Sequence, residues 1–430
     1  MTKSDWKKCK LGDVISIKHG FAFKGDFFVE TPTPYILVTP GNFNIGGGFK
    51  DAKLKYYNGP IPQDYILKPG DVIVTMTDLS KAGDTLGYSA LVPELKGKIL
   101  LHNQRIGLVL SESISISKQF IYWLMREHNY QQYIVNTASG STVKHTSPSR
   151  IEAFEFLLPP IEEQKRIAGI LGSLDDKIEL LQKQNKTLED MAKAIFKSWF
   201  VDFDIVKAKQ QGRPKADIIR EYHLTQELYD LFPSTSTDSP LGPIPTGWEV
   251  KKIHNLAILT MGQSPSGSTY NQNGTGLPFY QGRTDFGFRF PKKRVYCSAP
   301  TRIAEIDDIL ISVRAPVGDI NLANEKCCIG RGVASIRSKM SDNSFLYYSM
   351  LNIKNQFDVF NTEGTVFGSI NKNDLSNISI LTPNLQIIKA YNKIASKYDR
   401  KIINNTKQIQ TLTELRDTLL PRLISGKIKV

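Results

Sequence analysis

Three arginines in the second half of the chain each stand beside a short apolar run. Arg283 closes PFYQGR, Arg314 lies in DDILISVRA, and Arg331 opens RGVASI. A guanidinium is a rigid fork of donors that matches a carboxylate, a phosphate or the O6 and N7 atoms of guanine. Amide side chains, which can match adenine in the same bidentate way, occur in comparable places at Asn103, Gln104 and Gln281. Each residue therefore has two interpretations, contact with a base edge or an ordinary surface contact with a phosphate or a carboxylate.

The net charge narrows the choice of partner. The 430 residues include 55 Lys and Arg against 42 Asp and Glu, which gives a formal charge of +13. A protein of this size with such an excess of positive charge is typical of those that bind polyanions, and nucleic acid is the commonest polyanion. The alternative is a basic surface without a ligand. With 40% hydrophobic residues the chain has the composition of a folded protein, of about two to four domains.

The sequence contains no constellation typical of catalysis. GSTVK at 140–144 lacks the spacing of a phosphate-binding loop, and no Gly-x-Gly turn or Asn/Asp-Pro-Pro-aromatic tetrapeptide indicates a cofactor or methyl-transfer site. The six histidines and four cysteines have no metal-ligand spacing. Asp84, Glu94 and Lys96 have a nuclease-like order, which we interpret as a solvated turn. We therefore predict no catalytic residue and no metal site.

The candidate contacts lie on an internal repeat. Trp6 and Trp248 open two copies, which share a Pro-aromatic strand, an acidic turn before a β-branched run, a strand opened by arginine and an aromatic helix. A Thr-Val loop then leads to a proline and a long helix, so that Pro159 aligns with Pro383. A period as long as a domain indicates a duplicated head-plus-helix pair and not a solenoid. The Ser-, Thr- and Pro-rich end of segment 204–245 predicts a linker between the copies.

Both long helices repeat apolar residues at the 4-3 spacing of a coiled coil, from Ile167 to Trp199 and from Tyr391 to Leu423. One asparagine interrupts each seam, at 185 and 405, and a buried asparagine typically fixes the register. An antiparallel pairing that sets Asn185 opposite Asn405 gives every seam position a seam partner, whereas a parallel pairing sets each amide against hydrocarbon. We therefore predict an antiparallel coiled coil, about 50 Å long at about 1.5 Å per residue, that separates two heads.

Alignment of the two copies places the candidate contacts at equivalent strand ends. The aligned pairs are Thr39 with Arg283, Thr77 with Arg314, and Arg105 with Arg331. The arginines of the second head predict that it reads at least one G·C pair. Loops before the long helices hold further polar residues, which are expected either to contact phosphates or to cap helices. They are Lys144, His145 and Thr146 in the first copy and Thr365, Lys372 and Asn373 in the second.

With these features in view, the chain resembles the specificity subunits of Type I restriction–modification systems. The resemblance covers nearly the whole length and is most specific in STVKHTSPSRIEAFEFLLPPIEEQKRIAGILGSLDDKIELL, in VDFDIVKAKQQG and in LGPIPTGWEV. The second copy departs from the family's Pro-Pro-Leu/Ile-x-Glu-Gln pattern, because residues 382–387 read TPNLQI. The resemblance implies an α+β fold: two similar α/β target-recognition domains, each followed by a long helix, and an antiparallel coiled coil with pseudo-twofold symmetry.

The expected parts are target-recognition domain 1 at 1–155, helical region 1 at 156–203, the linker at 204–245, target-recognition domain 2 at 246–383 and helical region 2 at 384–430. The implied function is non-catalytic: the chain reads a bipartite, asymmetric target in double-stranded DNA and holds two modification subunits and the restriction subunits. The modification subunits methylate adenine from S-adenosylmethionine, the restriction subunits use ATP and Mg, and this chain itself needs no cofactor.

The absence of a signal core and of a long apolar span predicts a cytoplasmic chain that contacts no membrane. The aromatic end of the first helix, IFKSWFVDF, is expected either to dock a modification subunit or to pack on its own domain. A structural adaptor, whose heads bind protein and whose charge is incidental, remains the alternative to a DNA-reading function.

Overall fold

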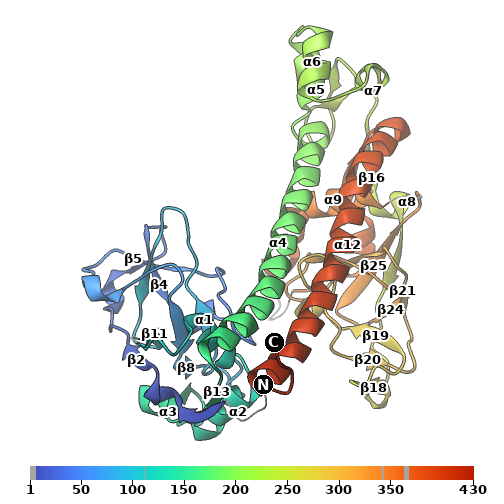
Figure 1. Ribbon diagram of the computed structural model, residues 1–430. Helices are drawn as coiled ribbons and strands as arrows, with labels where there is room; N and C mark the ends of the chain where they lie inside the picture. Colours follow the sequence, from blue (N-terminus) through green and yellow to red (C-terminus); the bar gives the residue numbers. More distant parts are fainter. Residues whose placement is uncertain (1–5, 112, 341–342, 363–367) are drawn as a thin grey trace. The chain divides into compact units, whose positions relative to one another are not determined.

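The structure is a computed structural model that describes residues 6–111, 113–340, 343–362 and 368–430. It divides into two compact units: unit 1 contains Met1–Leu180 and Gln408–Val430, and unit 2 contains Leu181–Lys407. Two helices of 40 residues, α4 (Ile161–Phe200) and α12 (Leu385–Ile424), each contribute one part to unit 1 and the other part to unit 2 (Figure 1). The sheet-rich remainder is called head 1 (residues 6–158) in unit 1 and head 2 (residues 244–382) in unit 2.

Head 1 is built from two main sheets. A five-stranded sheet has the order β3-β5-β4-β10-β6, in which only β4 and β10 are parallel neighbours. A four-stranded antiparallel sheet has the order β2-β11-β7-β9, and two short antiparallel pairs, β1-β13 and β8-β12, accompany them. The strands are β1 (Lys7–Lys10), β2 (Ser16–His19), β3 (Phe28–Val29), β4 (Tyr35–Val38), β5 (Lys55–Tyr57), β6 (Ile66–Leu67), β7 (Val72–Thr75), β8 (Thr77–Asp78), β9 (Ser89–Leu91), β10 (Ile99–His102), β11 (Ile106–Leu110), β12 (Lys144–His145) and β13 (Glu155–Leu158).

Head 2 repeats this topology strand for strand. Its five-stranded sheet has the order β18-β20-β19-β24-β21 with β19 and β24 parallel, its four-stranded sheet has the order β17-β25-β22-β23, and β16 pairs with β26. The duplication predicted from the sequence is therefore visible in the fold. The strands of unit 2 are β14 (Ser236–Thr237), β15 (Ile244–Pro245), β16 (Glu249–Lys252), β17 (Ala257–Met261), β18 (Tyr270–Asn271), β19 (Leu277–Tyr280), β20 (Tyr296–Cys297), β21 (Ile303–Ala304), β22 (Ile309–Ser312), β23 (Ile320–Leu322), β24 (Cys327–Ile329), β25 (Val333–Ser338) and β26 (Ser379–Thr382).

Strand β7 and its counterpart β22 explain why both heads have two apolar layers. All four residues of VIVT and of ILIS are buried, because each strand is covered on both faces. Val72 and Val74 pack with the helices of head 1, whereas Ile73 packs with the five-stranded sheet. In head 2, Leu310 faces the five-stranded sheet in the same way. Successive side chains of a strand point to opposite faces, so one strand joins both layers.

Short helices cover these sheets. The aromatic helices predicted in the two copies, FIYWLM and FLYYSM, are α1 and α9, and their rings are buried in the cores. In head 1 the helices are α1 (Lys118–Leu124), α2 (His128–Thr137) and α3 (Pro148–Glu152). In unit 2 they are α5 (Asp204–Gln210), α6 (Lys215–Glu221), α7 (Gln226–Leu231), α8 (Ile253–Leu256), α9 (Ser344–Asn352), α10 (Val359–Thr362) and α11 (Lys372–Ser376).

Segment 204–245, predicted from its composition to be a linker, is largely folded. It contains α5, α6 and α7, and the β14-β15 pair lies in its Ser- and Thr-rich end. The compositional argument concerned the Ser-, Thr- and Pro-rich end, whereas the helices lie in the earlier part of the segment, which contains most of its apolar residues. Ile205, Ile218 and Phe232 are buried in the core of unit 2. The aromatic end of α4 is buried there too: Trp199 and Phe200 pack against Tyr391, so this end packs on its own domain.

The two long helices pair antiparallel within each unit, as predicted. In unit 1 the first part of α4 meets the last part of α12, where Ile167 and Leu423 share one buried cluster. In unit 2 the second part of α4 meets the first part of α12, where the Tyr391 hydroxyl donates to the carbonyl of Ala192 at 3.1 Å. Apolar residues at the 4-3 spacing keep one face of each helix against the other.

Asn185 and Asn405 lie buried in the seam of unit 2, 3% and 0% exposed. They do not bond to each other. Asn185 Nδ2 donates to Thr406 Oγ1 at 3.3 Å, and Asn405 Nδ2 donates to Gln184 Oε1 at 3.4 Å. The two amides therefore lie one residue from the partners that the direct pairing would give, and both side-chain oxygens are without a hydrogen bond among the described residues.

The Glu-Gln pair at the start of α4 fastens this helix to head 1. Glu163 accepts a hydrogen bond from Trp6 Nε1 at 3.0 Å. The Gln164 amide is fully buried, accepts from Ser117 N at 2.9 Å, and donates to the carbonyls of Ser115 and Pro159. The second copy lacks this pair, and the Asn384 side chain instead accepts from Ile387 N at the start of α12.

Candidate nucleic-acid interface

The parallel strand pair in the five-stranded sheet of head 1 places two predicted contact residues side by side. Strands β4 and β10 run in register, with Val38 beside His102. Thr39 and Asn103 follow directly, because the carboxyl ends of parallel strands meet at the same edge of a sheet. We call this the strand-end edge of head 1.

A tight turn at this edge presents the side-chain amide of Gln104 and the guanidinium of Arg105. Asn103 is 9% exposed, and its side-chain oxygen accepts from Arg105 N at 3.1 Å, so its amide is used to form the turn. Gln104 and Arg105 are exposed at the tip. The neighbouring chain approaches so closely that a Cβ on Gly20 would lie 2.0 Å from the Asn103 carbonyl oxygen, which explains the glycine.

Thr77 and His145 come together beside this turn. Strands β8 and β12 pair Thr77 with His145 and Asp78 with Lys144, and Thr77 Oγ1 lies 3.1 Å from His145 Nδ1. Met76 N donates to the carbonyl of Arg105, which connects this pair to the turn. Six predicted contact residues thus belong to one edge, and a seventh, Lys144, lies next to them. The six are Thr39, Thr77, Asn103, Gln104, Arg105 and His145.

Asp78 lies at this edge, and its carboxylate accepts hydrogen bonds from its own loop. Burial raises the pKa of this carboxyl, but hydrogen bonds from Ser80 and Thr85 outweigh burial and hold the pKa below its usual value. Ser80 N donates at 2.7 Å and Thr85 Oγ1 at 2.8 Å. The carboxylate thereby holds the loop that carries Leu79.

A cavity of about 440 Å³ opens at the strand-end edge of head 1. Thr39 and the turn Asn103–Arg105 line it, together with Lys53 and Lys55, which the sequence analysis did not single out. Both lysines are exposed, and among the described residues neither forms an ion pair. Phe28 and Leu79 also line it, 42% and 69% exposed. The cavity thus combines apolar walls with amide and cationic side chains.

The corresponding edge of head 2 has a different set of side chains. Strands β19 and β24 are parallel, with Tyr280 beside Ile329, and are followed by Gln281 and by Gly330–Arg331. A Cβ on Gly332 would lie 2.2 Å from the Gln281 carbonyl oxygen, so the two strand ends are in close contact. Gln281 and Arg331 are exposed, and Arg331 N lies 3.3 Å from Ser264 Oγ. An amide and a guanidinium therefore share this edge.

Arg314 lies at the same edge, and Arg283 is engaged elsewhere on head 2. Arg314 pairs with Ser369 in a β-bridge and is exposed. Arg283 begins a 3-10 helix, and its Nε lies 2.6 Å from Asp319, to which Lys354 also binds at 2.6 Å. For Arg283 the structure thus shows the surface ion pair that was the alternative to base contact.

The backbone corrects two of the three aligned pairs. The Thr77–Arg314 pair is right, because both residues occupy the same bridge position. In head 1 Ile106 N donates to Asn103 O and Met76 N to Arg105 O; in head 2 Val333 N donates to Gly330 O and Val313 N to Gly332 O. Gln104 therefore corresponds to Arg331, and Arg105 to Gly332.

Thr39, which follows β4 directly, corresponds to Gln281 and not to Arg283. The sequence alignment failed because it matched residues across loops of different length, and for Arg105 and Arg331 it followed the residue type. A shift of one residue moves a side chain to the other face of a strand.

The remaining predicted residues lie at short helices. Ser147 caps α3 and Asn371 caps α11, with Lys372 as the exposed first residue of α11. Thr146 is 9% exposed and directly precedes the cap, so these loops lead to α3 and α11 and not straight to the long helices. Thr365 lies outside the described residues.

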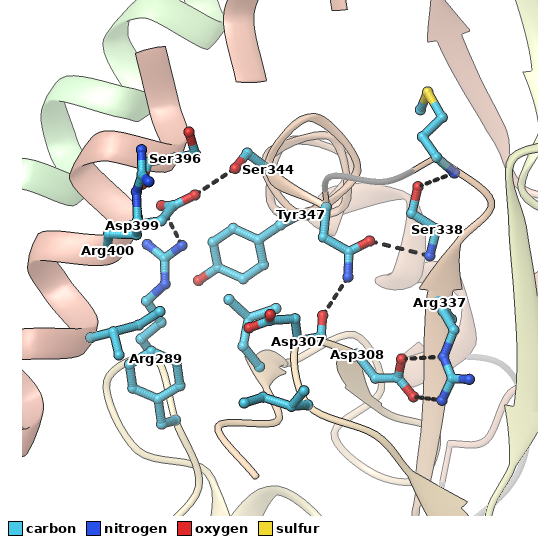
Figure 2. A pocket seen from close by; sticks show the side chains of 16 residues that line it. Arg289, Asp307, Asp308, Arg337, Ser338, Ser344, Tyr347, Ser396, Asp399 and Arg400 are labelled. Carbon is cyan, nitrogen blue, oxygen red and sulfur yellow. Dashed lines mark hydrogen bonds and ion pairs between the residues drawn. The ribbon is translucent and has the colours of Figure 1, made fainter. Parts of the chain in front are cut away.

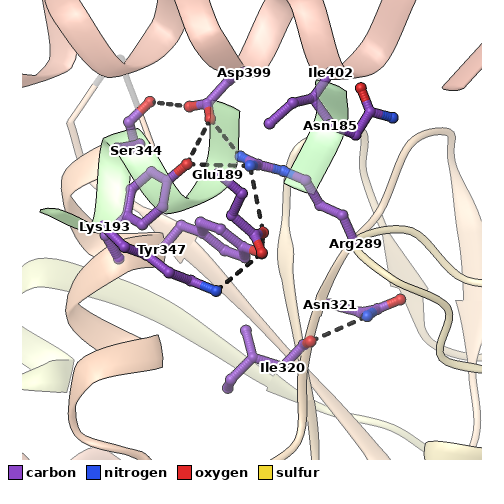
Figure 3. Close-up of polar contacts among 12 residues, drawn as sticks. Asn185, Glu189, Lys193, Arg289, Ile320, Asn321, Ser344, Tyr347, Asp399 and Ile402 are labelled. Atoms are coloured by element: carbon purple, nitrogen blue, oxygen red, sulfur yellow. Dashed lines mark hydrogen bonds and ion pairs between the residues drawn. The ribbon is translucent and has the colours of Figure 1, made fainter. Parts of the chain in front are cut away.

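A buried ion-pair network joins head 2 to the long helices inside unit 2. Arg289 is 2% exposed, and its Nη2 lies 2.5 Å from Asp399 on α12 (Figure 3). Glu189 on α4 lies 3.7 Å away and also binds Lys193 at 2.9 Å. Burial lowers the pKa of Arg289, but the nearby Tyr347 and Asp399 outweigh it and the pKa is raised. The guanidinium is therefore held charged at this joint.

A second cavity, of about 450 Å³, lies beside this joint (Figure 2). Four of its charged side chains bind one another: Arg337 forms a two-fold ion pair with Asp308 at 2.7 and 2.9 Å, and Arg289 binds Asp399. Arg400, which also lines the cavity, donates to the carbonyl of Ser396 at 3.2 Å. A charge that already has a partner is poorly available to a ligand. We interpret this cavity as part of the joint and not as a binding site.

Unit 1 has an equivalent joint made from a different segment. Arg126, 7% exposed, binds Asp175 on α4 at 2.6 Å, donates to Tyr122, and bonds to the carbonyl of Gly46 at 2.9 Å. Asp175 also binds Arg416 on α12. Burial raises the pKa of Asp175, but Arg126 and Arg416 outweigh it and lower the pKa. Sequence analysis missed both joints, because a single arginine in a loop gives no signal of burial.

Sites of two other kinds are absent from the described residues. No group of three or more His, Cys, Asp and Glu is arranged to hold a metal ion there. No helix among them is both long enough and apolar enough to pass through a bilayer.

Comparison with known proteins identifies the family. The model of the Type I restriction modification DNA specificity domain matches residues 3–190 and 245–414, which is one match to each head and helix. The chain belongs to this family. The MjaX specificity subunit of a type I restriction enzyme from Methanocaldococcus jannaschii is 33% identical over 99% of this chain and 94% of its own length.

Two further similarities agree with this assignment to the Type I specificity family. The HindI specificity subunit of Haemophilus influenzae is 26% identical over 99% of this chain and 100% of its own length. The crystal structure of a Type I restriction–modification S subunit from M. genitalium covers 97% of this chain and 96% of that chain with a TM-score of 0.58 at 15% identity. That structure therefore supports the fold of the specificity subunit and no finer statement.

Proposed function

We propose that this specificity subunit reads a bipartite, asymmetric target in double-stranded DNA, with one half read by each head. The subunit itself catalyses no reaction. The alternative is an adaptor whose heads bind protein.

One observation carries the proposal: the same strand-end edge is built twice with different side chains. Head 1 has Thr39, Thr77 and Gln104 where head 2 has Gln281, Arg314 and Arg331. Two copies of one scaffold with different polar groups at the same three positions are what two different half-sites require. An adaptor that binds two copies of one partner would instead retain one set of side chains.

The partners and their cofactors follow from the same proposal. Two modification subunits methylate one adenine in each half-site from S-adenosylmethionine, and restriction subunits that use ATP and Mg join the complex. This subunit positions them in the cytoplasm and holds no cofactor. The net charge of +13 supports the choice of DNA over a protein partner for the heads.

Methylation mapping tests the proposal directly. The subunit is expressed with its modification subunit in a host that lacks adenine methylation, and the genome is sequenced for modified adenines. We expect one asymmetric motif in two short parts with a fixed gap. Arg331→Ala should relax one part only and Gln104→Ala the other, each by about 1–3 kcal/mol of discrimination at one base pair. Arg400→Ala, at an exposed arginine of α12, is the matched control.

Salt dependence separates the two classes of function. For about 6–10 phosphate contacts, affinity for the motif duplex should fall by about 10³–10⁵ between about 50 and 200 mM salt. A stable complex that methylates no motif, together with duplex binding that ignores salt, would support the adaptor.

A further inference from the structure

The cavity at the strand-end edge of head 1 has an apolar side that the proposed contacts do not use. Phe28 is 42% exposed and Leu79 is 69% exposed, and both line the cavity together with the exposed Lys53, Lys55 and Arg105. Large apolar side chains left in water at a cationic edge are unfavourable for the free protein. A ligand that is both anionic and locally apolar would cover them.

In the major groove of DNA that apolar group is the C5-methyl of thymine. The other groups on the base edges there are hydrogen-bond donors and acceptors, and thymine alone adds a methyl. An amide side chain recognises the adenine of the same kind of pair. Gln104 is exposed on the turn that lines the cavity, and its side-chain amide has no hydrogen-bond partner among the described residues.

The edge of head 1 holds Leu79 firmly in this position. Asp78 accepts from Ser80 N and from the Thr85 side chain, and Ser80 Oγ accepts from the next turn of the loop. Leu79 therefore stands on a hydrogen-bonded loop, and little ordering would be needed when it meets the duplex. Phe28 is fixed by strand β3 and by an edge contact with the ring of Tyr57.

Head 2 carries different side chains at the positions that would read an A·T pair in head 1. Its counterpart of Leu79 is Pro316, its counterpart of Gln104 is Arg331, and its counterpart of Thr77 is Arg314. Guanidinium groups suit guanine, so at these three positions the apolar and amide side chains belong to head 1, whereas head 2 has its amide, Gln281, at the position of Thr39.

We infer that head 1 reads at least one A·T pair of its half-site by seating the thymine C5-methyl against Phe28 and Leu79, with Gln104 on the adenine of that half-site. The inference rests on the proposed function and names the chemistry of one half of the target.

The test removes the methyl and nothing else. Once methylation mapping has given the motif, and Arg331→Ala has identified the half read by head 2, each thymine of the other half is replaced in turn by deoxyuridine. Binding and methylation of these duplexes by the complex with the modification subunit are measured. At one position the loss of the methyl should weaken binding about fourfold, which is the effect of exposing one methyl group.

Variants then connect this effect to the cavity. Leu79→Ala or Phe28→Ala should weaken binding to the thymine duplex and bring the ratio between thymine and deoxyuridine duplexes close to one. Both residues are exposed enough for the fold to tolerate alanine. Ile114→Ala, at a residue of head 1 that is 96% exposed and does not line the cavity, should keep the fourfold ratio.

The outcomes are distinct. Deoxyuridine without effect at every position overturns the inference while leaving the two-headed function intact. An unchanged ratio in both alanine variants does the same. Failure to methylate any motif would instead reject the proposed function on which the inference rests.

Discussion

The buried joint of unit 2 gives a prediction whose size follows from its contacts. Asp399 accepts from Arg289 Nη2 at 2.5 Å, from Ser344 Oγ at 2.6 Å and from the Tyr348 hydroxyl at 3.0 Å. Asp399→Asn keeps the shape and one acceptor oxygen, which can still serve the Tyr348 hydroxyl, but it places an NH2 group beside Ser344 Oγ and removes the negative charge. Arg289, 2% exposed, would then be a buried cation without its main partner.

Removing one partner of a buried ion pair costs about 3–5 kcal/mol. Glu189 remains 3.7 Å from Arg289 and supplies part of the lost attraction, although it is shared with Lys193. We therefore expect the lower end of the range, about 3 kcal/mol, for Asp399→Asn. Arg289→Met in the same chain removes the buried cation, and the double variant should recover about 1 kcal/mol or more, since Glu189 keeps Lys193 as its partner.

Hydrogen exchange of the full chain measures this locally. Amides of α9 and of the first part of α12 should exchange about 100-fold faster in Asp399→Asn, which corresponds to about 3 kcal/mol, while amides of α1 remain protected. Exchange within threefold of the wild type in α9 would refute the reasoning, because the pair would then contribute no net stability. Equal exchange in the single and double variants would show that the buried cation is not the cause.

Three further changes have defined outcomes. Burial holds the pKa of His102 at about 4, below its usual value near 6.5, so the unfolded chain takes up the proton first as the pH falls. The free energy of unfolding of unit 1 should therefore fall by about 3 kcal/mol from about pH 6.5 to about pH 4. In urea titrations at several pH values, His102→Gln should flatten this dependence. Gln164→Ala should cost about 3 kcal/mol in urea unfolding because it leaves buried groups unpaired, whereas Gln182→Ala at an exposed position of α4 should cost less than about 0.5 kcal/mol. Asn185→Leu combined with Asn405→Leu should raise the thermal midpoint of unit 2, because both amide oxygens are buried without a donor; a lower midpoint would mean that the amides stabilise the seam.

The features that recur in the sequence could be predicted, because they rest on periodicity and duplication. The 4-3 spacing predicted that the two long helices pair, the asparagine in each seam predicted that they pair antiparallel, and the repeated order of motifs predicted two heads of one topology. The strand ends were also predicted to carry polar side chains, and those of head 1 lie together. Four of the predicted residues of head 1 line one cavity: Thr39, Asn103, Gln104 and Arg105.

The features that depend on exact register could not be predicted. Matching Arg105 to Arg331 follows chemical identity, but the hydrogen bonds of the turn match Arg331 to Gln104. The sequence also gave no sign that Arg283 would bind Asp319, because the two residues belong to different loops. Lys53, Lys55 and Leu79 look like ordinary loop residues until the fold brings them to one edge.

Comparison of the two joints shows which feature of a head is retained and which is not. Asp175 and Asp399 occupy equivalent places in the repeat, yet their arginines come from different segments, Arg126 after α1 and Arg289 in a loop before β20. Arg126 reaches the carbonyl of Gly46, which lies in the loop of head 1 that corresponds to the loop of Arg289. The position of the buried positive charge is therefore retained while its source in the chain differs.

This difference separates two requirements on a head. Its joint must place one cation against the carboxylate of a long helix, over aromatic rings that exclude water: Arg289 lies 4.5 Å from the centre of the Tyr347 ring, and Arg126 lies 4.4 Å from that of Trp123. Its strand-end edge, in contrast, is free to differ, since exposed residues at strand ends contribute little to stability. A head whose joint is constrained and whose strand-end edge is free to differ can carry a different set of side chains in each copy. The proposed reading of two different half-sites requires this.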